Sequence, residues 1–192
     1  GCLVAGGFLE DFVGVEEKVK FLLDEIGCGP GSGRPVYVVG HSMGGAVASL
    51  AAYALRVKYG FDLGGVYTFE APRVGNAFFA EAFEARIVDE APAFRITVDR
   101  DPIVHLPPAI FGFQHARGEV FYSKSGGYKV CDGAEDPECS AQYANMWHWM
   151  ISEHCRVPLT PSGSICECNG WVPLSQAPAP QLHTPKEGIV VV

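Results

Sequence analysis

A serine lies at the centre of the segment Gly40-His41-Ser42-Met43-Gly44, between an apolar run at 36–39 and a small-residue run at 45–52. Gly-x-Ser-x-Gly between a strand and a helix is typical of a nucleophile elbow, a tight turn that projects the serine from the backbone. A hydroxyl is a weak nucleophile, so it needs a nearby base and donors for the developing oxyanion. The segment predicts acyl transfer with Ser42 as nucleophile and the Met43 N–H as one oxyanion donor. Gly40 and Gly44 leave room where the strand and helix backbones approach each other.

The acid that orients the base is expected just beyond the end of a neighbouring strand. An apolar strand predicted at 94–98 is followed by two candidates, Asp99 and Asp101. We favour Asp101 as the acid because it can turn back toward the elbow and because Pro102 stiffens that turn. Asp99, beside Arg100, is interpreted as a solvated loop charge.

The base is one of six histidines. In this class of hydrolase the histidine follows the acid in the chain, which leaves His148 and His154 at a plausible distance. His148 is the first choice and His154 the alternative, because the base must face both the serine and the carboxylate. The remaining histidines are interpreted differently: His41 packs or forms hydrogen bonds beneath the elbow, His105 and His115 precede the last strand, and His183 lies in the C-terminal segment.

The elements that position these residues alternate between strand and helix. Residues 14–27 have the spacing of an amphipathic helix with Val15, Val19, Leu22 and Ile26 on one face. Further helices are predicted from the elbow to about 59, from Asn76 as N-cap to about 86, and over 141–154; strands are predicted at 36–39, 65–69, 94–98 and 118–122. Strands with little alternation, separated by helices, indicate an α/β fold whose parallel sheet is covered on both faces.

The composition favours some classes of protein and disfavours others. The 192 residues are 48% hydrophobic and 19% charged with a net charge of −8, which indicates a globular domain and disfavours binding to nucleic acid or an anionic membrane. No apolar run is long enough for a membrane helix. The seven cysteines fit no zinc-site spacing and favour an oxidising compartment, and hence a secreted protein. We expect a domain at 1–157, a flexible Pro-rich tail at 158–192, and no metal or cofactor.

Several longer segments match a known family. They are the elbow with Val39, Gly45 and Ala46, then residues 67–76, 94–97 with 101–108, and 112–115 before 119–122. With these motifs the chain resembles the class 3 (fungal-type) lipases, which include feruloyl esterase relatives. The resemblance implies an α/β-hydrolase fold and a Ser42–Asp101–His148 triad. It also implies a structural role for His115, a Cys131–Cys139 disulfide, and a bridge from Cys155 to the beginning of the chain.

The resemblance predicts a secreted triacylglycerol lipase that acts on a lipid or other ester, without a cofactor. Feruloyl or short-chain carboxylesterase and phospholipase A1 activity are the alternatives within the enzyme class. Two departures favour a third alternative, a non-catalytic lipid-binding or fragmentary domain. Ala5 stands where the family carries a histidine, and we expect the N-terminal part of the family fold, with the lid and the second oxyanion donor, to be absent.

Overall fold

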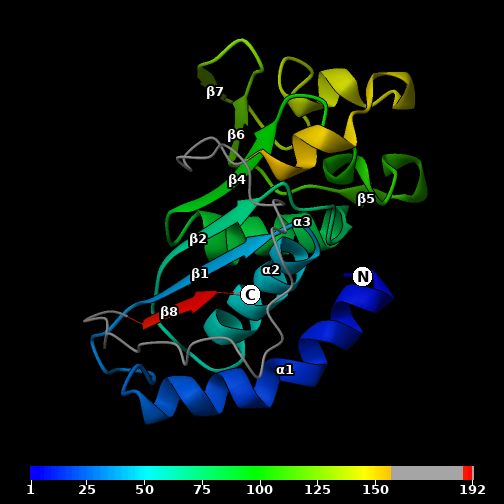
Figure 1. The fold of residues 1–192 in the computed structure, drawn as a ribbon. Helices are drawn as coiled ribbons and strands as arrows, with labels where there is room; N and C mark the ends of the chain where they lie inside the picture. Colours follow the sequence, from blue (N-terminus) through cyan, green and yellow to red (C-terminus); the bar gives the residue numbers. More distant parts are fainter. Residues whose placement is uncertain (157–187, 192) are drawn as a thin grey trace, which may run out of the picture.

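A six-stranded sheet forms the centre of the computed structural model, which describes residues 1–156 and 188–191 (Figure 1). The strand order is β7-β6-β4-β2-β1-β8, and every neighbouring pair is parallel except β6 with β7. The strands are β1 Val36–His41, β2 Leu63–Phe69, β4 Ala93–Val98, β6 Glu119–Tyr122, β7 Tyr128–Val130 and β8 Gly188–Val191. The mostly parallel sheet confirms the predicted α/β class. A separate antiparallel pair joins β3 Gly75–Asn76 to β5 Phe113–Gln114.

Three longer helices accompany the sheet: α1 Gly6–Glu25, α2 Met43–Val57 and α3 Ala77–Phe83. The Asn76 side chain accepts a hydrogen bond from the Phe79 N–H at 3.1 Å, so Asn76 is the N-cap of α3 as predicted. A π-helical turn, η1 Glu84–Val88, continues α3. The short 3₁₀ helices are η2 Ile103–His105, η3 Ala109–Phe111, η4 Ser140–Tyr143, η5 Met146–His148 and η6 Ile151–Cys155.

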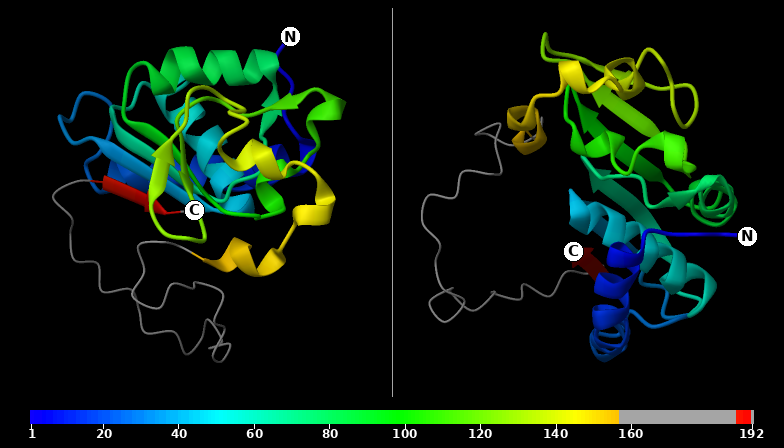
Figure 2. Two further views of the ribbon diagram at one scale, coloured as in Figure 1. Left: turned by 90° about the horizontal axis from the view of Figure 1, so that it is seen from above. Right: turned by 90° about the vertical axis from the view of Figure 1, so that its right-hand side faces the viewer.

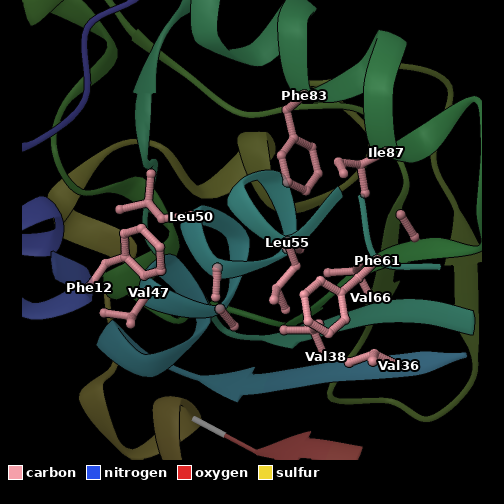
Figure 3. Packing of buried hydrophobic residues seen from close by; sticks show 14 of the residues in the cluster. Phe12, Val36, Val38, Val47, Leu50, Leu55, Phe61, Val66, Phe83 and Ile87 are labelled. Carbon is pink, nitrogen blue, oxygen red and sulfur yellow. The ribbon is translucent and has the colours of Figure 1, made fainter. Parts of the chain in front are cut away.

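The main hydrophobic cluster lies between the sheet and α2. Side chains of Val36, Val38 and Val66 on the strands meet Leu55 of α2 and Phe83 of α3 in this cluster (Figure 3). Burial alternates residue by residue along β1, and Figure 2 shows α2 and α3 on the same side of the sheet. Within the described residues β1 is therefore fully buried on one face only, whereas consecutive residues of β4 are buried on both faces. The expectation of a sheet covered on both faces thus holds for β4 and not for β1.

Helix α1 is longer than predicted and buries a different face. It begins at Gly6, because the N–H of Leu9 already donates to the carbonyl of Ala5 at 3.1 Å. Its buried side chains are Phe12 and Leu23, which belong to the main cluster. The predicted face was wrong in part: Val19 packs on the cluster, whereas the other three members, Val15, Leu22 and Ile26, are exposed.

The helix predicted over 141–154 is replaced by η4, η5 and η6. The backbone is extended at Asn145, Trp149 and Met150, which separates the three short helices. At the second break the N–H of Met150 donates to the carbonyl of Arg100 at 2.9 Å, in place of a helical acceptor. A long-range hydrogen bond therefore overrides the local helical pattern and changes the direction of the chain before His154.

Disulfides hold the C-terminal part of the described chain. Cys131, just after β7, is bonded to Cys139, just before η4, which confirms the pairing implied by the family resemblance. Cys155 is also disulfide-bonded, but Cys2 and Cys28 are free thiols, so the implied bridge from Cys155 to the beginning of the chain is not formed in this structure. Of the predicted tail, residues 158–187 and 192 lie outside the described residues, while residues 188–191 form β8 beside β1. Among the residues that the structure describes, no helix has the length and apolar character to cross a membrane.

Candidate active site

The serine elbow joins β1 directly to α2. Ser42 has φ 55° and ψ −130°, a conformation that non-glycine residues rarely adopt, and it precedes the first residue of α2. Its N–H donates to the carbonyl of Phe69 on β2 at 2.9 Å, which ties the turn to the sheet. A Cβ on Gly40 would lie 2.3 Å from the carbonyl oxygen of Gly44, so the elbow can close only with glycine at position 40. Strand and helix together hold the Ser42 hydroxyl at the carboxyl edge of the sheet.

Asp101 approaches the serine from the end of β4. Its side chain is fully buried, and its Oδ1 accepts a hydrogen bond from the N–H of Ile103 at 2.9 Å. This bond fixes the carboxylate and leaves Oδ2 to face the site. Asp99, which we interpreted as a solvated charge, is instead 5% exposed and pairs with Arg100 at 3.3 Å. Burial therefore does not separate the two aspartates, but only Asp101 faces a histidine.

His154 lies between the serine and the acid. Its Nε2 is 2.8 Å from Ser42 Oγ, and its Nδ1 is 2.9 Å from Asp101 Oδ2. The two ring nitrogens thus face the nucleophile and the carboxylate as a catalytic triad requires. His148 is exposed, and the aromatic neighbour of its ring is Tyr143 at 6.2 Å. The structure therefore places the alternative, His154, and not our first choice, His148, beside Ser42 and Asp101, because the break at Met150 redirects the chain.

A second carboxylate and a second histidine lie behind the triad. His41 Nε2 is 2.9 Å from Glu70 Oε2 and 3.0 Å from the backbone carbonyl of His154. The hydrogen bond to Glu70 raises the pKa of His41. Burial raises the pKa of Glu70 to about 7, and the negative charge of Asp101 acts in the same direction. The expected hydrogen bonding of His41 beneath the elbow is therefore observed, with a carboxylate partner that the sequence analysis did not consider.

The amino end of α2 lies beside the reactive hydroxyl. Met43 is its first residue, and the first N–H groups of a helix have no acceptor within the helix. The same end carries the positive pole of the helix dipole. Both properties suit a developing oxyanion next to Ser42, so the expectation of Met43 as donor remains a proposal that this geometry supports.

Two further histidines are structural. His115 is buried, its Nε2 is 2.7 Å from the carbonyl of Val104, and burial lowers its pKa well below the usual value. His105 is 4% exposed and stacks on Trp149 with 5.9 Å between the ring centres. Burial, with the nearby Arg73 charge, lowers the pKa of His105 to about 4. The histidine within hydrogen-bond distance of Ser42 Oγ is His154, and the contact of His115 with the Val104 carbonyl agrees with the structural role expected for His115.

Glu70 is the site residue that sequence reasoning missed. It follows β2 at the same edge of the sheet as Ser42, and an acidic residue directly after a buried strand was the available signal.

In the described residues, the ligating atoms of His41, Glu70 and His154 lie within 4.8 Å of one another, which is close enough to share a cation. However, acyl transfer by a serine, a histidine and an aspartate needs no metal.

The chain shares its sequence and fold with fungal lipases. The profile of the family described as Lipase (class 3) matches residues 1–111. Secreted mono- and diacylglycerol lipase 1 of Fusarium solani is 38% identical over an alignment of length 154 that covers 73% of this chain and 43% of the relative. Secreted mono- and diacylglycerol lipase 2 of Gibberella zeae is 33% identical over 191 residues, covering 88% of this chain and 45% of the relative. The chain therefore spans less than half the length of these two relatives.

Solved structures give the same result. The Rhizomucor miehei lipase–propeptide complex superimposes with a TM-score of 0.68 and 31% identity, over 82% of this chain and 50% of that chain. A triacylglycerol lipase described as having a serine protease triad at its catalytic centre gives a TM-score of 0.69 and 32% identity, over 81% of this chain and 59% of that one. These matches confirm the α/β-hydrolase fold. By sequence, by fold and by the arrangement of Ser42, Asp101 and His154, the chain belongs to the class 3 lipase family.

Proposed function

We propose that this chain carries the catalytic centre of a secreted serine ester hydrolase that cleaves acylglycerols. The observation that carries the proposal is the position of the His154 ring, 2.8 Å from Ser42 Oγ and 2.9 Å from Asp101 Oδ2. The names of the relatives, mono- and diacylglycerol lipases, support glycerol esters as substrates. The disulfide of Cys131 with Cys139 and the word "secreted" in those names support an extracellular location.

The proposed reaction proceeds through an acyl-enzyme. Ser42 Oγ attacks the ester carbonyl while His154 Nε2 takes up the hydroxyl proton, and Asp101 stabilises the resulting imidazolium. The tetrahedral oxyanion accepts a hydrogen bond from the Met43 N–H. Collapse of this intermediate breaks the ester bond, and His154 returns the proton to the departing alcohol. Water, deprotonated by His154, then attacks the acyl-enzyme, which releases the fatty acid and restores Ser42.

The test is hydrolysis by the 192-residue chain of p-nitrophenyl butyrate, p-nitrophenyl palmitate, and emulsified tri-, di- and monoolein. Ser42→Ala is the control, and it should remove turnover while leaving the far-UV circular dichroism unchanged. Preference for palmitate and the oleins would support a lipase, and preference for butyrate a short-chain esterase. Turnover that persists in Ser42→Ala would refute the assignment of Ser42. A folded chain without any turnover would favour the non-catalytic alternative.

The relative rates on the three oleins test a finer point. The family resemblance predicts a triacylglycerol lipase, whereas the names of two relatives specify mono- and diacylglycerols. The assay decides between them directly, because the three substrates share their acyl chain and differ only in the number of esterified hydroxyls.

A further inference from the structure

Glu70 is a buried carboxylate that the acyl-transfer steps above do not use. It directly follows β2, which lies between β1, the strand that leads to Ser42, and β4, the strand that leads to Asp101. Parallel strands end at a common edge of the sheet, so the three residues reach one place from three adjacent strands. The N–H of Glu70 donates to the carbonyl of Ile96 on β4 at 2.7 Å, which fixes its backbone. Glu70 is therefore placed as firmly as the nucleophile and the acid.

The backbone of Glu70 has the left-handed conformation that favours glycine. Its φ is 52°, and the other non-glycine residues with positive φ in the described chain are Ser42 and Asp99. All three directly follow a strand of the central sheet at the edge that carries the site. A non-glycine residue in this region costs free energy, and such residues persist where the surrounding structure holds them, often at functional sites. The carboxylate at position 70 is thus kept against a local preference for glycine.

The Glu70 side chain faces both histidines of the site. Its Oε2 is 2.9 Å from His41 Nε2 and 3.9 Å from His154 Nδ1. The backbone carbonyl of His154 also lies 3.0 Å from His41 Nε2, and a carbonyl can only accept, so Nε2 carries a hydrogen. His41 therefore links the Glu70 carboxylate to the backbone of His154. Within the described chain, the buried Oε1 of Glu70 has no hydrogen-bond partner.

We propose that Glu70 is a second carboxylate of the site, a positioning residue that holds His154 through His41 and adds negative charge behind its imidazole. The inference rests on the proposed function, since it assigns Glu70 a part in the same acyl transfer. Asp101 remains the nearer partner of Nδ1, at 2.9 Å against 3.9 Å. If Asp101 is removed, Glu70 is the carboxylate beside Nδ1 that can take its place.

The charge of Glu70 changes near neutral pH. Burial raises its pKa to about 7, and the groups that face it are His41 at the end of β1, Asp101 beyond β4, and His154 on η6. Asp101 raises the pKa of Glu70, whereas the two histidines lower it. Protonation of Glu70 below this range removes the negative charge behind the imidazole. The acid limb of the activity profile should therefore contain a contribution from Glu70.

Kinetics of three variants, Glu70→Gln, Asp101→Ala and the double variant, test the proposal. Glu70→Gln should lower kcat by about 3- to 10-fold with KM unchanged, because the buried side chain does not contact substrate. It should also move the acid limb of the kcat profile to lower pH, since a base without a neighbouring negative charge is easier to deprotonate. In the Asp101→Ala background the same substitution should reduce kcat further, by at least about 10-fold, since pairs that share a partner are not additive.

A readout that does not depend on turnover separates this inference from the proposed function. Proton NMR should show a far-downfield signal from the Nδ1–H of His154 that persists in Asp101→Ala and disappears in the double variant, because a charged acceptor makes the stronger hydrogen bond. If the chain has no esterase activity, the proposed function fails but this signal still decides the role of Glu70. Loss of the signal in Asp101→Ala alone, or no effect of Glu70→Gln on kcat and the pH profile in an active chain, would overturn the proposal.

Two further variants control for folding. Glu119→Gln changes an equally buried carboxylate, which pairs with Arg95 at 3.0 Å on the other side of β4. It should lower the melting temperature without moving the acid limb or the His154 signal. If Glu70→Gln does not fold, Glu70→Gly serves in its place, since glycine suits the positive φ. The same losses in kcat and in the NMR signal are then expected, and their absence contradicts the proposal.

Discussion

The two sides of the candidate active site are built in different ways. Ser42 and Asp101 extend from strands of the central sheet, and both are held by hydrogen bonds from or to backbone groups of the sheet and its loops. His154 belongs to the segment from η4 to η6, in which Met146, Trp147 and Ile151 are each more than 60% exposed. The nucleophile and acid therefore share the stability of the core, whereas a few long-range contacts position the base. Substitutions that disturb the backbone packing of the first region should lower the free energy of unfolding, whereas substitutions in the second region should lower kcat more than stability.

The largest effect should come from the base itself. His154→Ala should reduce kcat/KM for p-nitrophenyl butyrate by at least about 10⁴-fold, because Ser42 then has no proton acceptor. The matched variant His148→Ala changes the same side chain six residues earlier on an exposed turn, and it should change kcat/KM by less than about threefold. A larger loss in His148→Ala than in His154→Ala would show that the chain adopts another arrangement in solution.

The next-largest effect tests the side of the site that is built on the central sheet. In Gly40→Ala the added Cβ would meet the backbone carbonyl of Gly44 at 2.3 Å and Ala48 Cβ at 2.8 Å. Because a backbone carbonyl cannot move away without opening the elbow, we expect a loss of at least about 3 kcal/mol in the free energy of unfolding. Gly14→Ala in α1 is the control: nothing lies within 4 Å of its Cβ, and it should gain about 0.5–1 kcal/mol. Urea denaturation measures both, and a neutral Gly40→Ala would contradict the close approach.

The difference between the sheet, which carries Ser42 and Asp101, and the segment that carries His154 also explains which site residues could be predicted from the sequence. The strands before Ser42 and Asp101 are continuous apolar runs. The turns after these strands carry the residue types that acyl transfer needs, a serine nucleophile and an acid, so both positions were predictable. The segment around His154 depends on contacts between residues far apart in sequence, such as the bond from Met150 to Arg100, and no local pattern encodes these. The sequence therefore favoured His148 over His154, and the structure reverses that order.

The role of Glu70 and the buried face of α1 were not predicted, for related reasons. Glu70 lies in a loop that also contains Pro72, and such a sequence is typical of an ordinary turn. Only the strand order shows that Glu70 lies beside Ser42 at the edge of the sheet. Along α1, more than one spacing of apolar residues satisfies a helical period. Packing against α2, and not the pattern itself, selects Phe12 and Leu23 as the buried side chains.

Acid should weaken the contact between the two regions through His105. Burial lowers the pKa of His105 from 6.5 to about 4, so between these values the unfolded chain binds a proton that the folded chain does not. Its contribution to stability is unchanged above pH 6.5 and becomes unfavourable as the pH falls toward 4, by at most about 3 kcal/mol. The free energy of unfolding, measured in urea at pH 7, 5.5 and 4.5, should fall less steeply in His105→Asn. Parallel curves for the two proteins would show that other groups cause the acid sensitivity.

The smallest expected effect compares the loss of kcat with the loss of stability in the segment that carries His154. Trp149 stacks on His105 with 2° between the ring planes, and its Nε1 donates to the carbonyl of Tyr143 at 3.1 Å. Trp149→Ala removes both contacts just before the chain turns toward His154, so kcat should fall about 10-fold while the free energy of unfolding falls by about 1–2 kcal/mol.

Trp147→Ala is the matched control for Trp149→Ala, because Trp147 is 87% exposed and its loss should change kcat by less than about twofold. Esterase kinetics and urea denaturation of both variants give the two quantities. If Trp149→Ala lost stability but kept its kcat, the position of His154 would not depend on this stacking contact. The hydrogen bonds from His41 and Met150 would then be sufficient to hold the base in place.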